Sequence, residues 1–322
     1  MIGLMVLFLA MQTPALPAAR PCTAAEIAEL TRATDEPYGL TCRAVLTPDA
    51  RVTRRIVIEG AEASGAGIDC GGGVLGLPGR ATTTRTPTVA ILSRRQDGPS
   101  WSRPTDVSLA NCTVHGAVRI WGMGANGRIE DLRASSRTTD HTAAVQAVAP
   151  TRVTLTDVTF AATRSIPLYV GPGVTGVTVE RPRFTGRSVS TAVYLDAESA
   201  DNAIIYGVFD IRTGREQIAV DGSARNRITG NRFALGGRGG VFLYRNCGED
   251  AVIRHQTPSD NQITDNAFTG AGWFRSRAVV VGSREGGRPY CRADAGWPFG
   301  SSLDDGDHAT GNLVARNTVR RF

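Results

Sequence analysis

Acidic, phenolic and cationic residues recur in this chain about two dozen positions apart, each directly after a short apolar segment. Asp196, Asp221 and the pair Tyr244 and Arg245 occupy equivalent places in three successive segments. If these segments are stacked strands, their ends lie about 4.8 Å apart. Two carboxylates that close do not both keep an ordinary pKa unless a cation or an arginine neutralises them. The spacing therefore predicts an acid–base site, with a surface charge ladder as the alternative.

Further candidate residues surround this cluster. His255, in the segment Arg254-His255-Gln256-Thr257, is able to act as a base near neutral pH, although loop histidines are commonly only exposed. An aromatic stripe suited to stacking on sugar rings, or to packing under loops, consists of Tyr169, Tyr194 and Phe242. The expected substrate-binding guanidinium groups are Arg215 and Arg254, and the expected calcium ligands are Glu198 and Glu216.

These candidates fit three functions, of which the first is our leading hypothesis. A lyase or C5 epimerase must neutralise a uronate carboxylate, which suits Arg245 or calcium, and remove the C5 proton, which suits Tyr244, His255 or an arginine. A glycoside hydrolase would use Asp196 and Asp221, whose expected separation of about 5 Å is typical of a retaining enzyme. A non-catalytic adhesin would bind an acidic glycan through arginine and aromatic residues alone.

The elements that position these residues are predicted by an internal repeat. Phe160, Phe184, Phe209 and Phe233 are spaced by 24, 25 and 24 residues. Apolar residues alternate in a second strand of each repeat, and asparagines recur in one turn at Asn226, Asn261 and Asn312. Period, alternation and an asparagine ladder together predict an all-β fold, a single-stranded right-handed parallel β-helix.

The ends and loops of this solenoid follow from local signals. Thr23 and Glu26 form a capping box that predicts a short helix over residues 24–32, which caps the first coil. We expect a signal peptide at residues 1–19, an N-terminal cap at 20–55 and the β-helix at 56–322. Two insertions, near residues 246–259 and 283–311, follow the same strand position and are expected to border a binding face.

The charge balance limits the chemistry and the partners. All 36 basic residues are arginine, which excludes lysine-based catalysis, and the net charge is +6. An arginine-rich surface suits carboxylates, sulfates or phosphates. An acidic polysaccharide is favoured over nucleic acid, because no basic run is interleaved with aromatic residues. No later segment is long and apolar enough to span a membrane, and the oligomeric state is left open.

The six cysteines agree with export. An even number of cysteines in a secreted or periplasmic protein predicts disulfides, and the absence of CxxC spacing argues against a zinc site. Sequence order suggests the pairs Cys22–Cys42, Cys70–Cys112 and Cys247–Cys291, although six thiols allow fifteen pairings.

The helical cap, the Ile68-Asp-Cys-Gly-Gly-Gly turn and the Asn-x-Ile-x-x-Asn-x-Phe coils resemble the pectate-lyase-like right-handed β-helix superfamily. A shorter stretch, Glu216-Gln-Ile-Ala-Val-Asp221-Gly-Ser followed by Gly240-Val-Phe-Leu-Tyr-Arg245, is similar to the site of polysaccharide lyase family 6, the chondroitinase B and alginate lyase group. That resemblance implies that Glu216 binds calcium and Arg245 assists. The family's lysine base is replaced here by Asp221, so the base must lie elsewhere or the reaction must differ.

Overall fold

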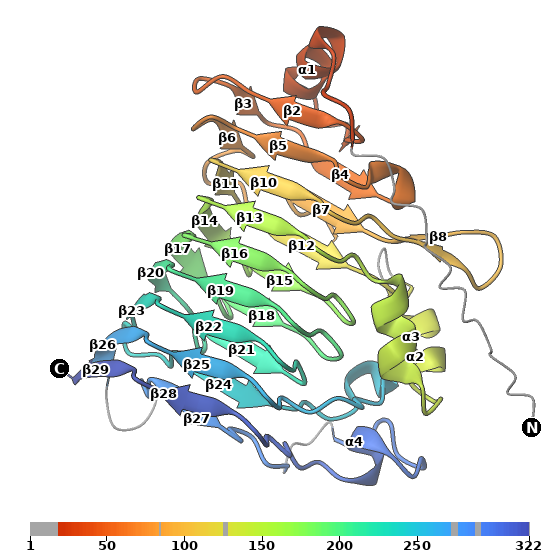
Figure 1. Ribbon diagram of the computed structural model, residues 1–322, viewed down its shortest axis with the longest axis vertical. Coiled ribbons are helices and arrows are strands. Elements are labelled where there is room, and N and C mark those ends of the chain that lie inside the picture. The colour runs from red at the N-terminus through yellow and green to blue at the C-terminus, as the bar shows by residue number, and fades with distance from the viewer. Residues whose placement is uncertain (1–18, 84, 125–127, 272–275, 287–290, 322) are drawn as a thin grey trace, which may run out of the picture.

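The computed structural model describes residues 19–83, 85–124, 128–271, 276–286 and 291–321. Within them the chain winds through repeated coils and builds three nine-stranded sheets (Figure 1). The strands of each sheet pair in parallel with the equivalent strands of the neighbouring coils. The fold is therefore the predicted right-handed parallel β-helix.

We number the sheets in the order in which the chain visits them. Sheet 1 contains β1 (Tyr38–Gly39), β4 (Ile56–Glu59), β7 (Val89–Leu92), β12 (Val118–Trp121), β15 (Leu168–Val170), β18 (Val193–Leu195), β21 (Ile218–Asp221), β24 (Val241–Tyr244) and β27 (Val279–Val281). Sheet 2 contains β2 (Arg43–Val45), β5 (Gly67–Asp69), β10 (Ser108–Ala110), β13 (Thr154–Thr156), β16 (Thr178–Glu180), β19 (Ala203–Ile205), β22 (Arg227–Thr229), β25 (Gln262–Thr264) and β28 (Leu313–Ala315). Sheet 3 contains β3 (Arg51–Val52), β6 (Val74–Leu75), β11 (Thr113–His115), β14 (Thr159–Arg164), β17 (Arg183–Ser188), β20 (Val208–Arg212), β23 (Arg232–Ala234), β26 (Ala267–Ala271) and β29 (Thr318–Arg321).

The core is stacked coil upon coil, as the repeat predicts. The rings of Phe160, Phe184, Phe209, Phe233 and Phe268 form one column with centroids 4.4–4.7 Å apart. Offset-stacked rings at this spacing interact favourably beyond the apolar area that they bury. The column therefore fixes the register of successive coils.

Buried asparagines form two ladders beside this core. The predicted ladder begins one coil earlier than expected and comprises Asn202, Asn226, Asn261 and Asn312. A second ladder, which the sequence analysis missed, comprises Asn231, Asn266 and Asn317. In each step the Oδ1 atom of one residue accepts hydrogen bonds from the backbone N–H and the Nδ2 atom of the residue one coil before it. Buried polar groups in the turns are thereby satisfied.

The N-terminal end carries the predicted cap. The helix α1 (Ala24–Thr31) begins with the expected capping box between Thr23 and Glu26, and its Leu30 is fully buried. The strands β1 to β3 already lie before residue 56, within the segment expected to form the cap. All three disulfides have the pairing that sequence order suggested: Cys22–Cys42, Cys70–Cys112 and Cys247–Cys291.

Four insertions leave the solenoid after strands of sheet 1. The antiparallel pair β8 (Arg94–Arg95) and β9 (Trp101–Ser102) follows β7, and the helices α2 (Ile129–Ser135) and α3 (His141–Val148) follow β12. The segment with the short helix Glu249–Ala251 follows β24, and the segment with α4 (Gly300–Leu303) follows β27. Sequence analysis found only the last two, because the first two lie before Phe160, where the repeat is not yet regular.

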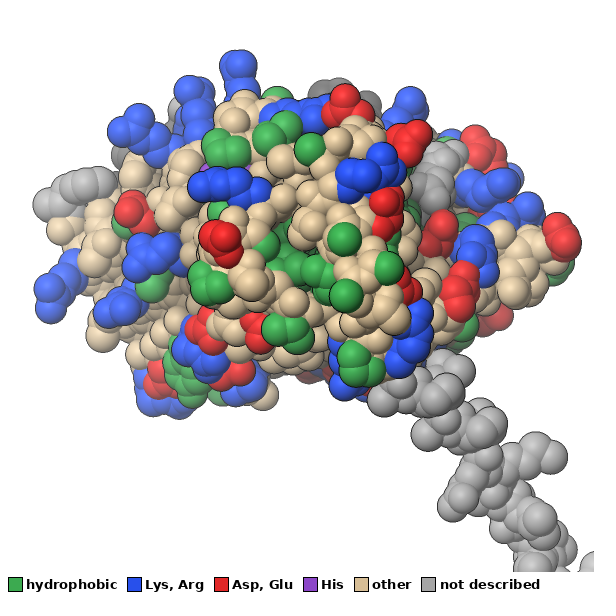
Figure 2. Space-filling model, turned by 90° about the horizontal axis from the view of Figure 1, so that it is seen from above, with side chains coloured by type: hydrophobic (Ala, Val, Ile, Leu, Met, Phe, Trp, Pro, Cys, Tyr) green, Lys and Arg blue, Asp and Glu red, His purple; other side chains and the backbone are tan. Residues whose placement is uncertain are grey.

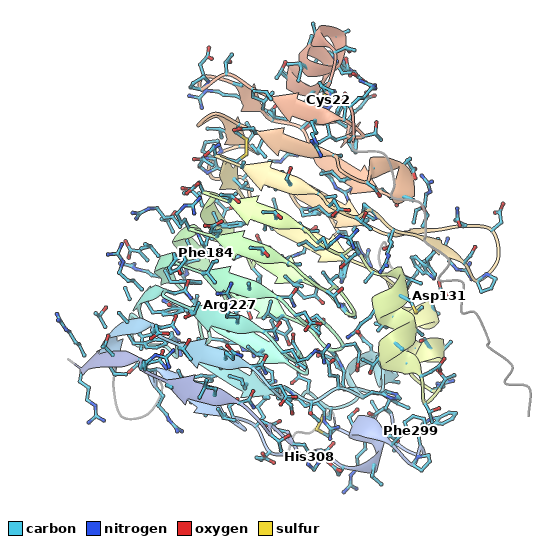
Figure 3. The ribbon with its side chains drawn as sticks, viewed as in Figure 1. Cys22, Asp131, Phe184, Arg227, Phe299 and His308 are labelled. Carbon is cyan, nitrogen blue, oxygen red and sulfur yellow. A yellow bond between two sulfur atoms is a disulfide. The ribbon has the colours of Figure 1, made fainter. Side chains whose placement is uncertain are left out.

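The molecular surface is polar and mixed in charge. Seen from above, basic and acidic side chains are both scattered around the periphery (Figure 2). Asp131 of α2 and Phe299 beside α4 lie on the same side of the solenoid, opposite Phe184 (Figure 3). In the part of the chain that the structure describes, no helix is long and apolar enough to cross a membrane. Residues 1–18 of the expected signal peptide lie outside the described residues.

Candidate active site

The outer face of sheet 1 presents two rows of side chains, because residues of a strand alternate between the core and the exterior. The first row comprises Arg119, Tyr169, Tyr194, Ala219 and Phe242. The second row lies at the strand ends and comprises Trp121, Gly171, Asp196, Asp221 and Tyr244. The predicted aromatic stripe and the predicted carboxylates thus lie side by side on the outer face.

Tyrosines of the first row donate hydrogen bonds to carboxylates of the second row one coil further on. The hydroxyl of Tyr169 donates to Oδ2 of Asp196, and that of Tyr194 donates to Oδ2 of Asp221 at 2.5 Å. The two tyrosine rings stack with centroids 5.7 Å apart. Burial and the neighbouring carboxylates raise the pKa of both phenols well above the usual value. Both tyrosines are therefore neutral hydrogen-bond donors at physiological pH rather than bases.

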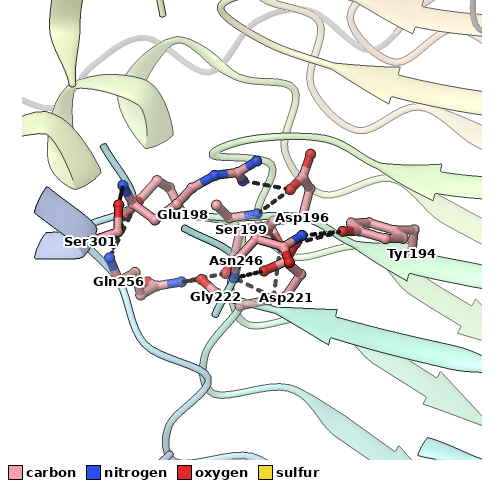
Figure 4. Close-up of polar contacts among 12 residues, drawn as sticks. Tyr194, Asp196, Glu198, Ser199, Asp221, Gly222, Asn246, Gln256 and Ser301 are labelled. Carbon is pink, nitrogen blue, oxygen red and sulfur yellow. Dashed lines mark hydrogen bonds and ion pairs between the residues drawn. The ribbon is translucent and has the colours of Figure 1, made fainter. Parts of the chain in front are cut away.

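Asp196 is held by a buried ion pair. Its Oδ1 atom accepts a hydrogen bond from Nη1 of Arg254 at 2.7 Å, and the two side chains are 9% and 10% exposed, respectively. Burial alone would lower the pKa of Arg254, but the charges of Asp196 and Asp221 outweigh it and raise that pKa. Arg254 is therefore a fixed cation beside Asp196. Asp196 lies close to Asp221, Asn246 and Tyr194 (Figure 4).

Asp221 lies behind the site surface. It has no exposed area, and its carboxylate accepts hydrogen bonds from the backbone N–H of Asn246 at 2.7 Å and from Nδ2 of the same residue at 2.5 Å. Burial raises the pKa of Asp221, although Arg254 and the hydrogen bonds offset part of that rise. Asp221 therefore fixes the positions of Tyr194 and Asn246, and its carboxylate is out of reach of a substrate.

A second cluster closes the C-terminal side of the site around Tyr244. This tyrosine is fully buried, and its hydroxyl contacts Nη2 of Arg215 and Oε1 of Glu216, the latter at 3.0 Å. Burial, Glu216 and Asp221 raise its pKa well above the usual value, which does not suit the predicted role of Tyr244 as a base. The guanidinium of Arg284 lies 3.7 Å above the tyrosine ring.

Arg245 and His255 do not line the site pocket that is described below. The guanidinium of Arg245 contacts Asp304 at 2.9 Å, and its backbone N–H donates to Asp307 at 2.8 Å. His255 directs Nε2 toward the backbone carbonyl of Ser136, and its ring lies 5.0 Å from that of His141. Both predicted catalytic residues therefore connect the insertions to one another.

The two predicted calcium ligands do not fit a calcium site. Both carboxylate oxygens of Glu198 accept backbone N–H groups of His255 and Gln256 at 2.7–3.2 Å, so Glu198 anchors that loop. Glu216 is occupied by Arg215 and Tyr244. Among the described residues, the one group with three suitable ligand atoms is Cys247, Cys291 and Asp305, and its sulfurs form a disulfide.

A pocket of about 720 Å³, which we call the site pocket, opens over the two rows. Five of the predicted residues line it: Tyr169, Tyr194, Asp196, Arg215 and Arg254. Asn246 and Arg284 line it as well, together with apolar residues of the insertions that include Ile129, Leu132 and Val252. The predicted residues outside its described lining are Phe242, Asp221, Tyr244, Arg245, His255, Glu198 and Glu216.

The lining residues that sequence analysis missed lie at or inside the insertions. Asn246 is the first residue of one predicted insertion, and Arg284 is the second residue of the other, just after β27. Trp121 belongs to the second row, and it has room because the next coil has Gly171 there. A Cβ atom at Gly171 would lie 2.1 Å from Cδ1 of Trp121. The glycine at position 171, where the next two coils have Asp196 and Asp221, could have predicted that a large side chain packs there.

The fold and the site define a right-handed parallel β-helix protein with a pocket of arginine, tyrosine and aspartate on the outer face of one sheet. No protein-family profile matches the chain, and no curated protein matches it. One solved structure that it resembles is a mutant of the periplasmic alginate epimerase AlgG, at 11% identity and a TM-score of 0.38. The similarity covers 88% of this chain and 68% of that chain.

Proposed function

We propose that this protein binds an acidic, uronic-acid-containing polysaccharide in the site pocket and cleaves it by β-elimination. One observation supports the proposal above all. Three guanidinium groups line a single pocket, and the same pocket contains a phenol that is hydrogen-bonded to a carboxylate. The three groups belong to Arg215, Arg254 and Arg284, and the pair is Tyr169 with Asp196.

Arg215 and Arg284 are suited to hold the uronate carboxylate. Both are only partly buried, so a ligand can reach them, and Tyr244 lies beneath both guanidinium groups at 5.8 and 3.7 Å from its ring centroid. Arginine binds planar carboxylates through two parallel hydrogen bonds. Charge neutralisation of the carboxylate stabilises the carbanion-like transition state that forms when the C5 proton leaves.

Asp196 and Tyr169 supply the proton transfers. The carboxylate of Asp196 takes the C5 proton, the electron pair of the broken C5–H bond forms the C4–C5 double bond, and the C4–O bond breaks. The leaving oxygen takes the phenol proton of Tyr169. Asp196 then returns its proton to Tyr169 through their hydrogen bond, which restores both groups.

The position of these groups favours elimination over C5 epimerisation. Asp196 and Tyr169 both belong to the outer face of sheet 1, whereas epimerisation requires proton transfer on two faces of the sugar. The insertions bring apolar Ile129, Leu132 and Val252 to the pocket, together with the acidic residues Glu249 and Asp250. A hydrolase that uses Asp196 with Asp221 is disfavoured because Asp221 has no exposed area.

The test is a panel of uronic-acid polymers incubated with the protein in water and in deuterium oxide. New ultraviolet absorbance from the C4–C5 double bond is the expected result. Deuterium at C5 without absorbance would support epimerisation, and measurable binding without either signal would support an adhesin. The Arg284→Ala variant should lose activity, and Arg152→Ala, which breaks an exposed ion pair with Asp106, should retain it.

A further inference from the structure

The site pocket ends abruptly toward the C-terminal coils. Tyr169 and Tyr194 line it on two successive coils, but Ala219, the next residue of the same row, has no exposed area. Ala219 packs with Tyr194 and Tyr244. At this end of the pocket Arg284 donates a hydrogen bond from Nη1 to Oδ1 of Asn246, and Asn246 is itself 3% exposed.

This C-terminal end is held firmly. Asn246 donates to Asp221 from both its backbone and its side chain, and the next residue, Cys247, is joined to Cys291 by a disulfide. The backbone N–H of Arg284 donates to Asp307 at 2.7 Å. Bonded contacts of this kind limit the opening of the pocket on this side.

In the opposite direction a second cavity of about 430 Å³ adjoins the site pocket. The two cavities share the lining residues Trp121, Gly124, Ile129 and Asp250. The second cavity adds three arginines that belong to the N-terminal coils: Arg55, Arg85 and Arg119. From the coil of β21 to the coil of β4 is a distance of about 24 Å, since five steps of about 4.8 Å separate them.

We propose that the site pocket receives the end of an acidic polysaccharide chain, so that the protein is exolytic. This inference rests on the proposed function. The reducing-end uronate, whose C4 carries the glycosidic oxygen that leaves, lies against Arg215 and Arg284 at the closed end. The rest of the chain leaves over the second cavity, past Arg55 and Arg85. A chain that continued in both directions along the solenoid axis would meet Asn246 and Arg284.

The products of cleavage test the proposal on the wild-type protein. With a long uronic-acid polymer, we expect the smallest unsaturated product from the earliest time points, while the size distribution of the polymer shifts slowly. An early, broad ladder of intermediate fragments would overturn the inference and leave the proposed function intact. If no polymer gives a double bond or deuterium at C5, the proposed function itself fails.

Two variants sharpen this test. Arg85→Ala, an exposed position, should raise KM for long oligosaccharides by about threefold to tenfold and leave the shortest cleavable substrate unaffected. Asn246→Ala should open the closed end and increase the share of fragments cut internally. Equal effects of Arg85→Ala on short and long substrates, or an unchanged product pattern in Asn246→Ala, would contradict a closed-end pocket. Arg152→Ala is the matched control for lost arginine charge.

Discussion

At the scale of single residues, the tyrosine–aspartate pairs show how equivalent positions acquire different roles. Tyr169 and Tyr194 make the same hydrogen bond to the next coil, yet Asp196 lines the pocket and Asp221 is fully covered. The difference comes from Asn246, which bonds to Asp221 alone of the two carboxylates. One position in a repeat can thus face the pocket while the equivalent position in the next coil is buried and holds its neighbours in place.

Replacing Tyr169 by phenylalanine tests the role of the phenol. Tyr169→Phe removes the hydroxyl that donates to Asp196 and keeps the ring that stacks on Tyr194. We expect kcat to fall by roughly a hundredfold with little change in KM, because general acid catalysis contributes on that order. The measurement is steady-state kinetics from product absorbance.

The control for this variant is Tyr206→Phe, since the side chain of Tyr206 is 59% exposed in a turn far along the coil from the site. Its kinetics should match those of the wild type. An unchanged kcat in Tyr169→Phe would remove this tyrosine from the mechanism, and an equal loss in both variants would point to a general effect of the substitution.

Part of the site could be predicted from sequence at this scale. The alternation of strand residues identified Tyr169, Tyr194 and Asp196 as neighbours on the outer face, because register follows from the repeat. It could not predict the burial of Asp221 or the direction of Arg245. Both depend on the insertions after β24 and β27, which have no repeat from which to derive their positions.

At the scale of elements, the asparagine ladders contribute more to stability than the exposed ion pairs. Asn266→Ala removes the acceptor of two hydrogen bonds from Asn231 and leaves both donors buried. We expect the free energy of unfolding to fall by about 3 kcal/mol, because an unsatisfied buried group carries its full desolvation penalty. Urea denaturation followed by circular dichroism measures this change.

The comparison variant is Arg181→Ala, which breaks an ion pair with Asp157 whose side chains are 47% and 41% exposed. Solvent screens such pairs, so the loss should stay below about 1 kcal/mol. A larger effect for Arg181→Ala than for Asn266→Ala would reverse the proposed order of the two interactions.

The helix α3 is expected to respond to acid through its first residue. His141 is buried, and burial together with His255 and Arg254 lowers its pKa from 6.5 to about 3, while Asp140 opposes the shift. Because the unfolded state takes up the proton first, stability is greatest above about pH 6.5 and falls as the pH drops toward 3. His141→Gln should lose less stability over this range.

Hydrogen exchange of α2 and α3 at several pH values follows this transition. The exposed His308, which faces Asp304 across 2.6 Å, provides the control variant His308→Gln. If the acid response of α3 is the same in the wild type and in His141→Gln, then another group controls it.

At the scale of the whole molecule, two of the disulfides stabilise different parts of the protein, one the coils and the other the inserted loops. Cys70–Cys112 joins the coils, whereas Cys247–Cys291 joins two insertions, and their sequence separations are nearly equal at 42 and 44 residues. Loop-closure entropy alone therefore predicts that each disulfide raises the free energy of unfolding by about 4 kcal/mol. Their locations should make the consequences of removing them different.

Replacing Cys70 and Cys112 together by serine should lower the global unfolding midpoint. The same change at Cys247 and Cys291 should instead increase hydrogen exchange in the two insertions and reduce activity, with a smaller effect on the midpoint. Exchange mass spectrometry and thermal denaturation separate the two effects. A loss of activity that accompanies an equal loss of global stability in both double variants would refute this division.

The fold itself could be predicted almost fully from sequence. Phe160, Phe184, Phe209 and Phe233 repeat every 24 or 25 residues, and a period of that kind admits few architectures. The helices α2 and α3 escaped prediction because they occupy one non-repeating insertion. Local patterns decide where strands and turns lie, but the packing of an insertion against a sheet depends on contacts between distant segments.

The four insertions described above leave the solenoid after a strand of sheet 1. The phenylalanine column lies in sheet 3, and the ladder of Asn231, Asn266 and Asn317 lies between sheets 2 and 3. These two stacks are therefore encoded outside the insertions that help to line the site pocket. Such a chain tolerates the exchange of one loop for another of different length, because each coil is already held by its neighbours. The inserted loops could therefore be replaced to change the binding specificity while the core residues stay the same.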